Sequence, residues 1–396
     1  MKNNQLTVKL AIQLASPHTW IASIGPVLFG ILFCKLERYP LSFWKSILLI
    51  FTCIFMQSSV NTFNDYMDYI KGNDSEKDYV EESDAVLIYN SINPKQALIL
   101  GIIHLILGAV LGIIACIQSG FLPLGIGCIG GIVVLLYSGG PFPISYLPIG
   151  EIISGFVMGI LIPLGVAAVS DGKLHNEIFL YALPLMIGIA LIMMTNNGCD
   201  IEKDLRAKRH TLAVLLGRKN TKNLYHILIV IWLLVTSALS IYLLGIIGYI
   251  TPVLILLLGY RCFKFLMQSE LLTHKRIEQM KNIVKANIIV NIAYFIAILT
   301  KIIMEMIKVN VENVKGILVT TSNRVAQELG VQHKHLLEKI DGYVNKFNSA
   351  ELSAQFDIMQ NFIDKTDKFS SAELSAQFYI PYNYKDRSGK ANRNYL

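Results

Sequence analysis

Two groups of acidic and amide side chains have the residue types and spacing to do chemistry. The first lies in the segment NTFNDYMDYIKGND, which begins at residue 61. Its polar side chains recur at i, i+3, i+4 and i+7: Asn61, Asn64, Asp65 and Asp68. Residues at these spacings share one face of an α-helix, so a helix through this segment would present its amides and carboxylates together.

The second group lies in the segment TNNGCDIEKDLRAKRH, residues 195–210. Asn197, Asp200 and Asp204 stand at i, i+3 and i+7 and therefore also share a helical face. Two carboxylate clusters aimed at one site would repel each other unless a cation lay between them. Carboxylate and amide oxygens suit a hard cation, Mg²⁺ rather than Zn²⁺.

Magnesium usually takes one or two carboxylates and completes its shell with water and substrate phosphate. Arg206, Lys208 and Arg209 lie beside the second cluster and could neutralise the remaining phosphate charge. The residue types therefore predict a Mg²⁺–diphosphate site. For any single aspartate, a solvated helix end is the alternative.

The elements that must position these groups are long apolar segments. Of the 396 residues, 53 % are hydrophobic and 16 % charged, which excludes an ordinary soluble globule, a disordered chain and a disulfide-stapled one. About 20 apolar residues span a bilayer. We predict an all-α membrane bundle of nine such helices, near residues 16–34, 42–63, 95–117, 120–138, 149–170, 177–199, 223–245, 247–263 and 284–305.

Basic residues indicate the orientation of this bundle. The N-terminus and the loops after even-numbered spans carry 18 Lys and Arg, whereas the opposite side carries six. An excess of basic residues marks the cytoplasmic side. Both acidic clusters follow even-numbered spans, so we expect a multi-pass protein of the cell membrane with its N-terminus and active-site mouth in the cytoplasm. Repeated glycines between residues 101 and 131 predict close helix packing.

Over about residues 10–305 the chain resembles the UbiA-type intramembrane aromatic prenyltransferases. The resemblance rests on NDxxD after the second predicted span and DxxxD after the sixth. Four segments resemble the branch that prenylates 1,4-dihydroxy-2-naphthoate: SPHTWIASIGPVLFG, NDYMDYIKGND, YSGGPFPISYLPIGE and NNGCDIEKD with the later TLAVLLG.

The resemblance implies transfer of a polyprenyl group from an allylic polyprenyl diphosphate to an aromatic ring. With dihydroxynaphthoate as acceptor, CO₂ is lost and demethylmenaquinone forms, a step of menaquinone biosynthesis. The implied Mg²⁺ ligands are Asn64, Asp65, Asp68, Asp200 and Asp204, with the four aspartates as catalytic groups. The implied substrate-binding residues are Asn61, Asn64, Lys71, Asn197, Lys208, Arg209, Tyr137 and Tyr146.

Several of these positions leave alternatives open. Tyr137 and Tyr146 could shape the acceptor pocket, help to deprotonate the acceptor, or simply pack. Glu151 either supports the site or is an acid at an interfacial helix start. Where the superfamily has a third aspartate this chain has Gly72, with Asp74 two residues later, so the metal role of Asp74 is open. Lys208 stands where the branch usually has glycine.

The end of the chain is predicted to be a separate domain. We divide the sequence into a membrane domain, 1–308, and a tail, 309–396, in which FNSAELSAQF recurs as FSSAELSAQF. Residues 316–344 predict a strand, a helix to Leu329, a turn and a second helix, so the tail would be a small α/β or helix-turn-helix-like appendage. It resembles a truncated Rha-type phage regulatory protein. We expect the tail to be non-essential and the main domain to bind no nucleic acid.

Prenyl transfer is the function that these observations favour. The expected partners are a polyprenyl diphosphate, dihydroxynaphthoate and the lipid bilayer, with Mg²⁺ as cofactor. One alternative is a different aromatic acceptor. Another is a non-enzymatic transporter, which the placement of both acidic clusters on one membrane side disfavours. A third is a membrane-tethered regulator in which the tail carries the function.

Overall fold

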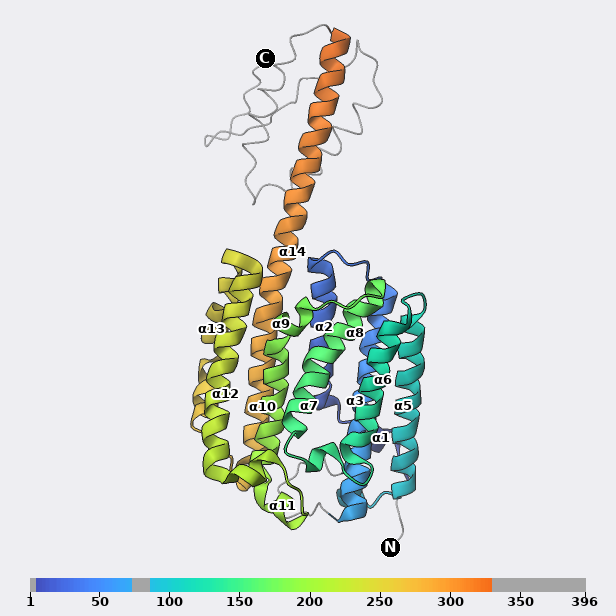
Figure 1. The fold of residues 1–396 in the computed structure, drawn as a ribbon, viewed down its shortest axis with the longest axis vertical. Helices are drawn as coiled ribbons and strands as arrows, with labels where there is room; N and C mark the ends of the chain where they lie inside the picture. The colour runs from blue at the N-terminus through green and yellow to red at the C-terminus, as the bar shows by residue number, and fades with distance from the viewer. Residues whose placement is uncertain (1–4, 73–85, 330–396) are drawn as a thin grey trace, which may run out of the picture. The chain divides into compact units, whose positions relative to one another are not determined.

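The computed structural model describes residues 5–72 and 86–329, and this part of the chain is helical, without a β-strand (Figure 1). Most of the helices run side by side as a bundle (Figure 1). The elements in chain order are α1 Val8–Leu14, η1 Pro17–Thr19, α2 Ile21–Leu36, α3 Phe43–Lys71, α4 Val86–Asn90, α5 Pro94–Cys116, α6 Phe121–Ser138, η3 Ile144–Tyr146, α7 Gly150–Phe156, η4 Val157–Leu161, α8 Ile162–Asp171, α9 Glu177–Tyr181, α10 Leu183–Cys199, α11 Ile201–Arg206, α12 Leu212–Leu244, η5 Gly245–Tyr249, α13 Ile250–Met267, η6 Thr273–Lys275 and α14 Arg276–Leu329.

The predicted membrane spans correspond to helices, but their number is not settled by helix length. Among the described residues six helices are long and apolar enough to cross a membrane, or seven if the pair Val8–Thr19 and Ile21–Leu36, bent by 57°, is one span. Helix α10 is shorter, and α12 with α13 forms one apolar stretch, Leu212–Met267. The chain is therefore a multi-pass membrane protein, and the count of nine stays a prediction.

Helix α3 carries the first acidic cluster, and its two ends have local causes. The hydroxyl of Ser42 accepts a hydrogen bond from the backbone N–H of Lys45, which caps the first turn. Gly72 ends the helix in the left-handed conformation, with φ 66°. Between them the 29-residue helix is apolar at first and polar in its last turns, so the acidic face comes at its C-terminal end.

The glycines of α5 confirm the expected close packing, because this helix lies directly against α3. A Cβ atom added at Gly101 would come within 2.6 Å of the Phe63 ring, and one at Gly108 within 3.1 Å of Met56. The α6 glycines are different: apart from chain neighbours and the backbone of their own helix, no described atom lies within 4 Å of such a Cβ at residues 125, 127, 130 and 131. Close packing was thus a correct prediction for α5 and a wrong one for α6.

Two apolar clusters hold the centre of the bundle. One gathers Phe29 and Phe33 of α2 with Tyr294 of α14, and the other surrounds Trp232 of α12, whose indole N–H donates to the Pro184 carbonyl over 2.7 Å. The outward side of α5 is also apolar, with Ile99, Ile106 and others about half exposed. A helix with apolar side chains on every face is typical of a lipid environment.

Helix α14 runs without interruption through the start of the predicted tail. The strand expected near residue 316 is therefore wrong, because the chain there continues the helix to Leu329. The compact units of the chain divide within this helix, between Ile302 and Ile303. Residues 330–396, with the expected second helix and the sequence duplication, lie outside the described residues, as does Asp74.

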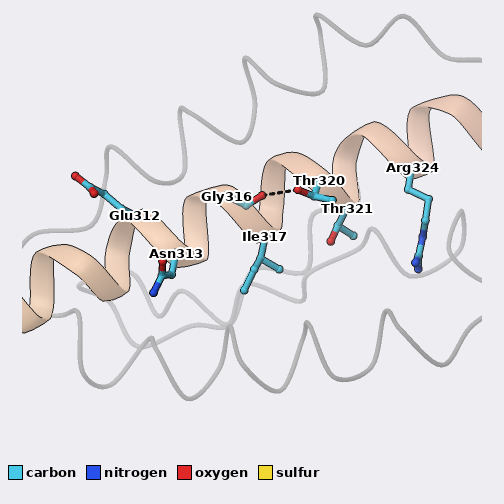
Figure 2. Close-up of a pocket in the computed structure, with 7 residues that line it drawn as sticks. All are labelled: Glu312, Asn313, Gly316, Ile317, Thr320, Thr321 and Arg324. Carbon is cyan, nitrogen blue, oxygen red and sulfur yellow. Dashed lines mark hydrogen bonds between the residues drawn. The ribbon is translucent and has the colours of Figure 1, made fainter. Parts of the chain in front are cut away.

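The second unit also contains a pocket on α14. Figure 2 shows its lining residues along one side of the helix, where the Thr320 hydroxyl donates to the Gly316 carbonyl over 2.9 Å. The lining residues are Glu312, Asn313, Gly316, Ile317, Thr320, Thr321 and Arg324. None of them belongs to the predicted active site.

Candidate active site

The two predicted acidic clusters meet through a single arginine at one end of the bundle. The Arg209 guanidinium is ion-paired through Nη2 to Asp68 on α3, and its Nη1 lies 3.7 Å from Asp204 Oδ1 on α11. Both carboxylates are buried, with 5 % and 2 % of their surface exposed. Since like charges in a buried site repel, a cation between them is what holds the two clusters together. Asp68 and Asp204, one from each predicted cluster, therefore lie on either side of one guanidinium.

A turn at Lys208 reverses the chain after α11, so that the Arg209 side chain can reach Asp68 and Asp204. The Arg209 N–H donates to the Asp204 carbonyl over 2.8 Å, and the Lys208 N–H donates to the Leu205 carbonyl over 3.2 Å. This pair of bonds is the Schellman motif that ends helices with a left-handed residue, here Lys208 with φ 54°. Glycine adopts that conformation without steric cost, which explains why glycine suits this position.

A second arginine, which the sequence analysis did not select, holds Asp200. The Arg276 Nε lies 3.1 Å from Asp200 Oδ1, and its Nη2 donates to the side-chain oxygen of Asn196 over 2.6 Å. Arg276 is 6 % exposed and opens α14, far along the sequence from the acidic motif. The only signal in the sequence was its place in a basic loop on the side of the predicted active-site mouth.

The environment of Asp204 favours its protonated form. The pKa of Asp204 is raised to about 7, chiefly by burial and also by the negative charge of Asp200, while Arg209 opposes the rise. The Thr211 hydroxyl donates to Asp204 Oδ2 over 3.2 Å, which favours the ionised form. Asp204 therefore changes charge near neutral pH as long as no other cation joins the site.

An aromatic ring supports the basic residues. Lys71 Nζ lies 4.5 Å from the centre of the Tyr146 ring, and the Arg209 guanidinium carbon lies 4.7 Å from it. The backbone N–H of His210 donates to the Tyr146 carbonyl over 2.8 Å, which ties η3 to the turn after α11. The structure thus places Tyr146 and Lys71 beside Arg209, and the two lysines, Lys71 and Lys208, are both exposed.

Two residues of the first cluster make contacts that organise the fold. The Asn61 amide donates to the Ala15 carbonyl and the Thr19 hydroxyl over 2.9 and 2.8 Å, joining α3 to the chain around η1. Asp65 accepts from the backbone N–H of Val86 over 2.9 Å. Helical spacing predicted the shared face correctly, but it could not separate these contacts from ligand binding.

The remaining predicted residues make hydrogen bonds that connect α3, α6, α7 and α10. Asn64 accepts from the Ser138 hydroxyl over 2.9 Å and donates to Asp68 Oδ2 over 3.4 Å. The Tyr137 hydroxyl lies 3.5 Å from the Ser154 hydroxyl and 3.7 Å from the sulfur of Met193. Asn197 donates to Glu151 Oε1 over 2.9 Å.

The donor chemistry of this site fits Mg²⁺. Four buried carboxylates supply the oxygen atoms that the ion prefers: Asp65, Asp68, Asp200 and Asp204. A guanidinium already lies between two of them as a cation. In the described part of the chain no three His, Cys, Asp or Glu side chains approach one another closely enough to hold a metal ion, so the ligand set stays a prediction.

Fold and site together define a membrane-embedded helical enzyme with a charged site at one end of an apolar bundle. The model of the UbiA prenyltransferase family matches residues 23–285, and the chain belongs to that family. It is a prenyltransferase, as the names of its relatives also indicate.

Two relatives carry the same name. The 1,4-dihydroxy-2-naphthoate octaprenyltransferase of Bacillus subtilis is 32 % identical over 212 residues, which cover 54 % of this chain and 67 % of the relative. The 1,4-dihydroxy-2-naphthoate octaprenyltransferase of Mycobacterium tuberculosis is 28 % identical over 214 residues, covering 53 % and 71 %. These similarities support aromatic prenyl transfer.

Solved structures agree with the fold. A UbiA homologue from Archaeoglobus fulgidus has a TM-score of 0.53 at 14 % identity, covering 74 % of this chain and 99 % of the homologue. The same homologue has been solved with DMAPP and Mg²⁺ bound, at a TM-score of 0.50, 14 % identity and coverages of 74 % and 98 %.

Proposed function

We propose that the protein transfers a polyprenyl group from a polyprenyl diphosphate to 1,4-dihydroxy-2-naphthoate, with loss of CO₂ and with Mg²⁺ as cofactor. The observation that supports this most directly is the Arg209 bridge, which brings Asp68 and Asp204 of two separate motifs to one place. The relatives named dihydroxynaphthoate octaprenyltransferases support the choice of acceptor. A different hydroxylated aromatic ring is the alternative acceptor.

At the diphosphate end, the metal ligands and the basic residues would have separate roles. Asn64, Asp65, Asp68, Asp200 and Asp204 would hold the ion. Bound Mg²⁺ would neutralise charge on the departing diphosphate. Arg209 and Lys71 supply fixed positive charge for the same group, and the Tyr146 ring keeps both in place. Lys208 would add a further cation at the exposed rim.

The apolar bundle supplies the other requirement of the reaction. Breaking the allylic C–O bond leaves an allylic cation that water destroys, so the ring must attack it in a dry chamber. The acidic site lies at the end of the bundle, where α3 and α11 meet, and the membrane is the source of the long apolar donor. In our proposal the site opens to the cytoplasm of the cell, and the tail from 309 onward is dispensable.

A direct assay tests the proposal. The full chain in nanodiscs is incubated with a radiolabelled polyprenyl diphosphate, dihydroxynaphthoate and Mg²⁺, beside Asp68→Asn and Asp204→Asn. We expect labelled lipid product and CO₂ from the unaltered chain, lost in both variants and on chelation. Diphosphate release without coupling would show the acceptor to be another ring. No metal-dependent consumption of donor by folded protein would overturn the proposal.

A further inference from the structure

A buried carboxylate beside the charged cluster has one oxygen engaged and one that lacks a partner. Glu151 is 4 % exposed, and its Oε1 accepts from the Asn197 amide over 2.9 Å. Its Oε2 is buried, and no atom of the described residues forms a hydrogen bond with it. An unsatisfied buried carboxylate oxygen is costly, so such a position calls for a ligand.

The neighbours of Glu151 suit an aromatic ring. Ser154 follows on the same face of α7, and its hydroxyl lies 3.5 Å from that of Tyr137 on α6. The Tyr137 hydroxyl also contacts the sulfur of Met193 on α10. A phenol and a thioether are side chains that suit contact with a flat ring.

The position of Glu151 relative to the charged cluster fits a second substrate. Asn197, which holds Glu151, precedes Asp200 by three residues on α10, about one helical turn further into the bundle. Arg209, Lys71 and Tyr146 serve the diphosphate end and make none of the hydrogen bonds of Glu151. Glu151 therefore contacts α10 about one turn further into the bundle than Asp200, which is the side where the proposed reaction requires the aromatic ring.

The place of Glu151 in its helix does not require a buried side chain. Glu151 is in the first turn of α7, where an acid suits the helix N-terminus, but an exposed carboxylate would serve there as well. A glutamine would hold Asn197 equally well through its carbonyl oxygen, so the Asn197 contact does not require an acid either.

We propose that Glu151 Oε2 binds a ring hydroxyl of the aromatic acceptor and serves as its catalytic base. This inference rests on the proposed function and names the residue that handles the acceptor. The O–H bond breaks and its proton moves to Oε2, while the O–H electron pair forms a ring carbonyl. The ring carbon then forms the new bond to the allylic carbon, whose C–O pair leaves with the diphosphate.

The aromatic ring is restored without any further reagent. When the attacked carbon bears a carboxylate, the carbon–carboxylate pair returns to the ring as CO₂ departs. The ring carbonyl then takes the proton back from Glu151. When that carbon bears hydrogen, Glu151 first returns its proton to the ring oxygen, and the freed Oε2 then takes the proton from the carbon and releases it to solvent.

The test compares Glu151→Gln and Glu151→Asp with the control Glu177→Gln in the full chain. Glutamine keeps the shape and the Asn197 bond but cannot act as a base, and Glu177 is an acid at the start of α9, outside the site. Donor binding with Mg²⁺ and prenyl transfer are measured separately, for acceptors whose hydroxyl groups differ in acidity.

We expect Glu151→Gln to lower the transfer rate about 10²–10⁴-fold with dihydroxynaphthoate while donor affinity stays within twofold. The loss should shrink as the acceptor hydroxyl becomes more acidic, since such rings need less help to ionise. Glu151→Asp, which keeps the base, should retain more activity than Glu151→Gln, and Glu177→Gln should behave as the unaltered chain.

Three outcomes would count against the role. Transfer by Glu151→Gln within threefold of the unaltered chain would overturn it. An equal loss for acceptors of every acidity would overturn it too, because that pattern indicates a purely structural role. If the unaltered chain transfers no prenyl group to any hydroxylated ring, the proposed function fails and the Glu151 role fails with it.

Discussion

The two acidic motifs of this protein are neutralised in different ways. The α10–α11 motif has two cations: Arg276, from the start of α14, holds Asp200, and Arg209 follows Asp204 by five residues. The α3 motif brings no arginine to its acids, and Asp68 pairs with Arg209 from the other motif. The first motif is thus organised by the second, and the residue with the greatest influence on both is a cation rather than an acid.

Removal of Arg209 should have the largest effect. Arg209→Ala leaves Asp68 and Asp204 buried without their shared cation, which typically costs about 3–5 kcal/mol. It also removes fixed positive charge from the diphosphate end, and we expect prenyl transfer to fall by about 10²-fold or more. The measurements are the rate of transfer and the thermal unfolding midpoint in detergent.

The control for this variant is Lys222→Ala, which removes a basic residue paired with Glu270 in an exposed ion pair. Such pairs contribute about 0–1 kcal/mol, so activity should be unchanged. An Arg209→Ala protein as active as the control would contradict the view that one arginine organises both motifs.

Removal of Arg276 should affect only the second motif. Arg276→Gln leaves Asp200 without its guanidinium but keeps a side chain that can donate to Asn196. We expect transfer to fall on the order of tenfold, mainly through weaker donor binding, because Asp200 loses its fixed orientation. The KM values for donor and acceptor distinguish weaker donor binding from general damage to the protein. A KM that rises for the acceptor alone would contradict the predicted loss of donor binding.

The pKa of Asp204 gives the second motif a pH dependence. Because folding raises that pKa from 3.8 to about 7, the protonated carboxyl stabilises the fold fully below about pH 4. This contribution is lost as the pH rises through 7. We expect the unfolding midpoint without Mg²⁺ to fall by on the order of 5 °C between pH 5 and 8 relative to Asp204→Asn. Parallel pH profiles for the two proteins would contradict the assignment.

The sequence was informative where a local pattern decides the structure. Helical spacing alone predicted that Asp68 belongs to a polar face, and the order of spans predicted that Asp204 would lie at the same end. Arg276 could not be predicted, because its contact with Asp200 depends on how α14 packs and no local spacing encodes it. Asn61 shows the converse case: its spacing matched the site, but packing against the chain around η1 uses its amide.

The same distinction applies to the end of the chain. The apolar and β-branched residues near 316 are compatible with a strand when taken locally, yet they continue a helix that began at Arg276. Extension of an existing helix adds a hydrogen bond for each residue fixed, whereas a lone strand has no partner to pair with. The preceding part of α14 therefore outweighed the local strand propensity near residue 316.

The smallest predicted effect concerns the turn that connects the two motifs. Lys208 has φ 54°, a conformation that costs a residue with a Cβ atom about 1–2 kcal/mol and costs glycine nothing. Lys208→Gly should therefore raise the unfolding midpoint by about 2–4 °C, and transfer should change less than twofold because the exposed lysine lies at the rim of the site. Lys285→Gly serves as the control: Lys285 is exposed in the interior of α14, where glycine costs about 1 kcal/mol, so its midpoint should fall. A Lys208→Gly protein that is less stable but keeps its fold would show that the lysine side chain, and not the turn, stabilises the link between the two motifs.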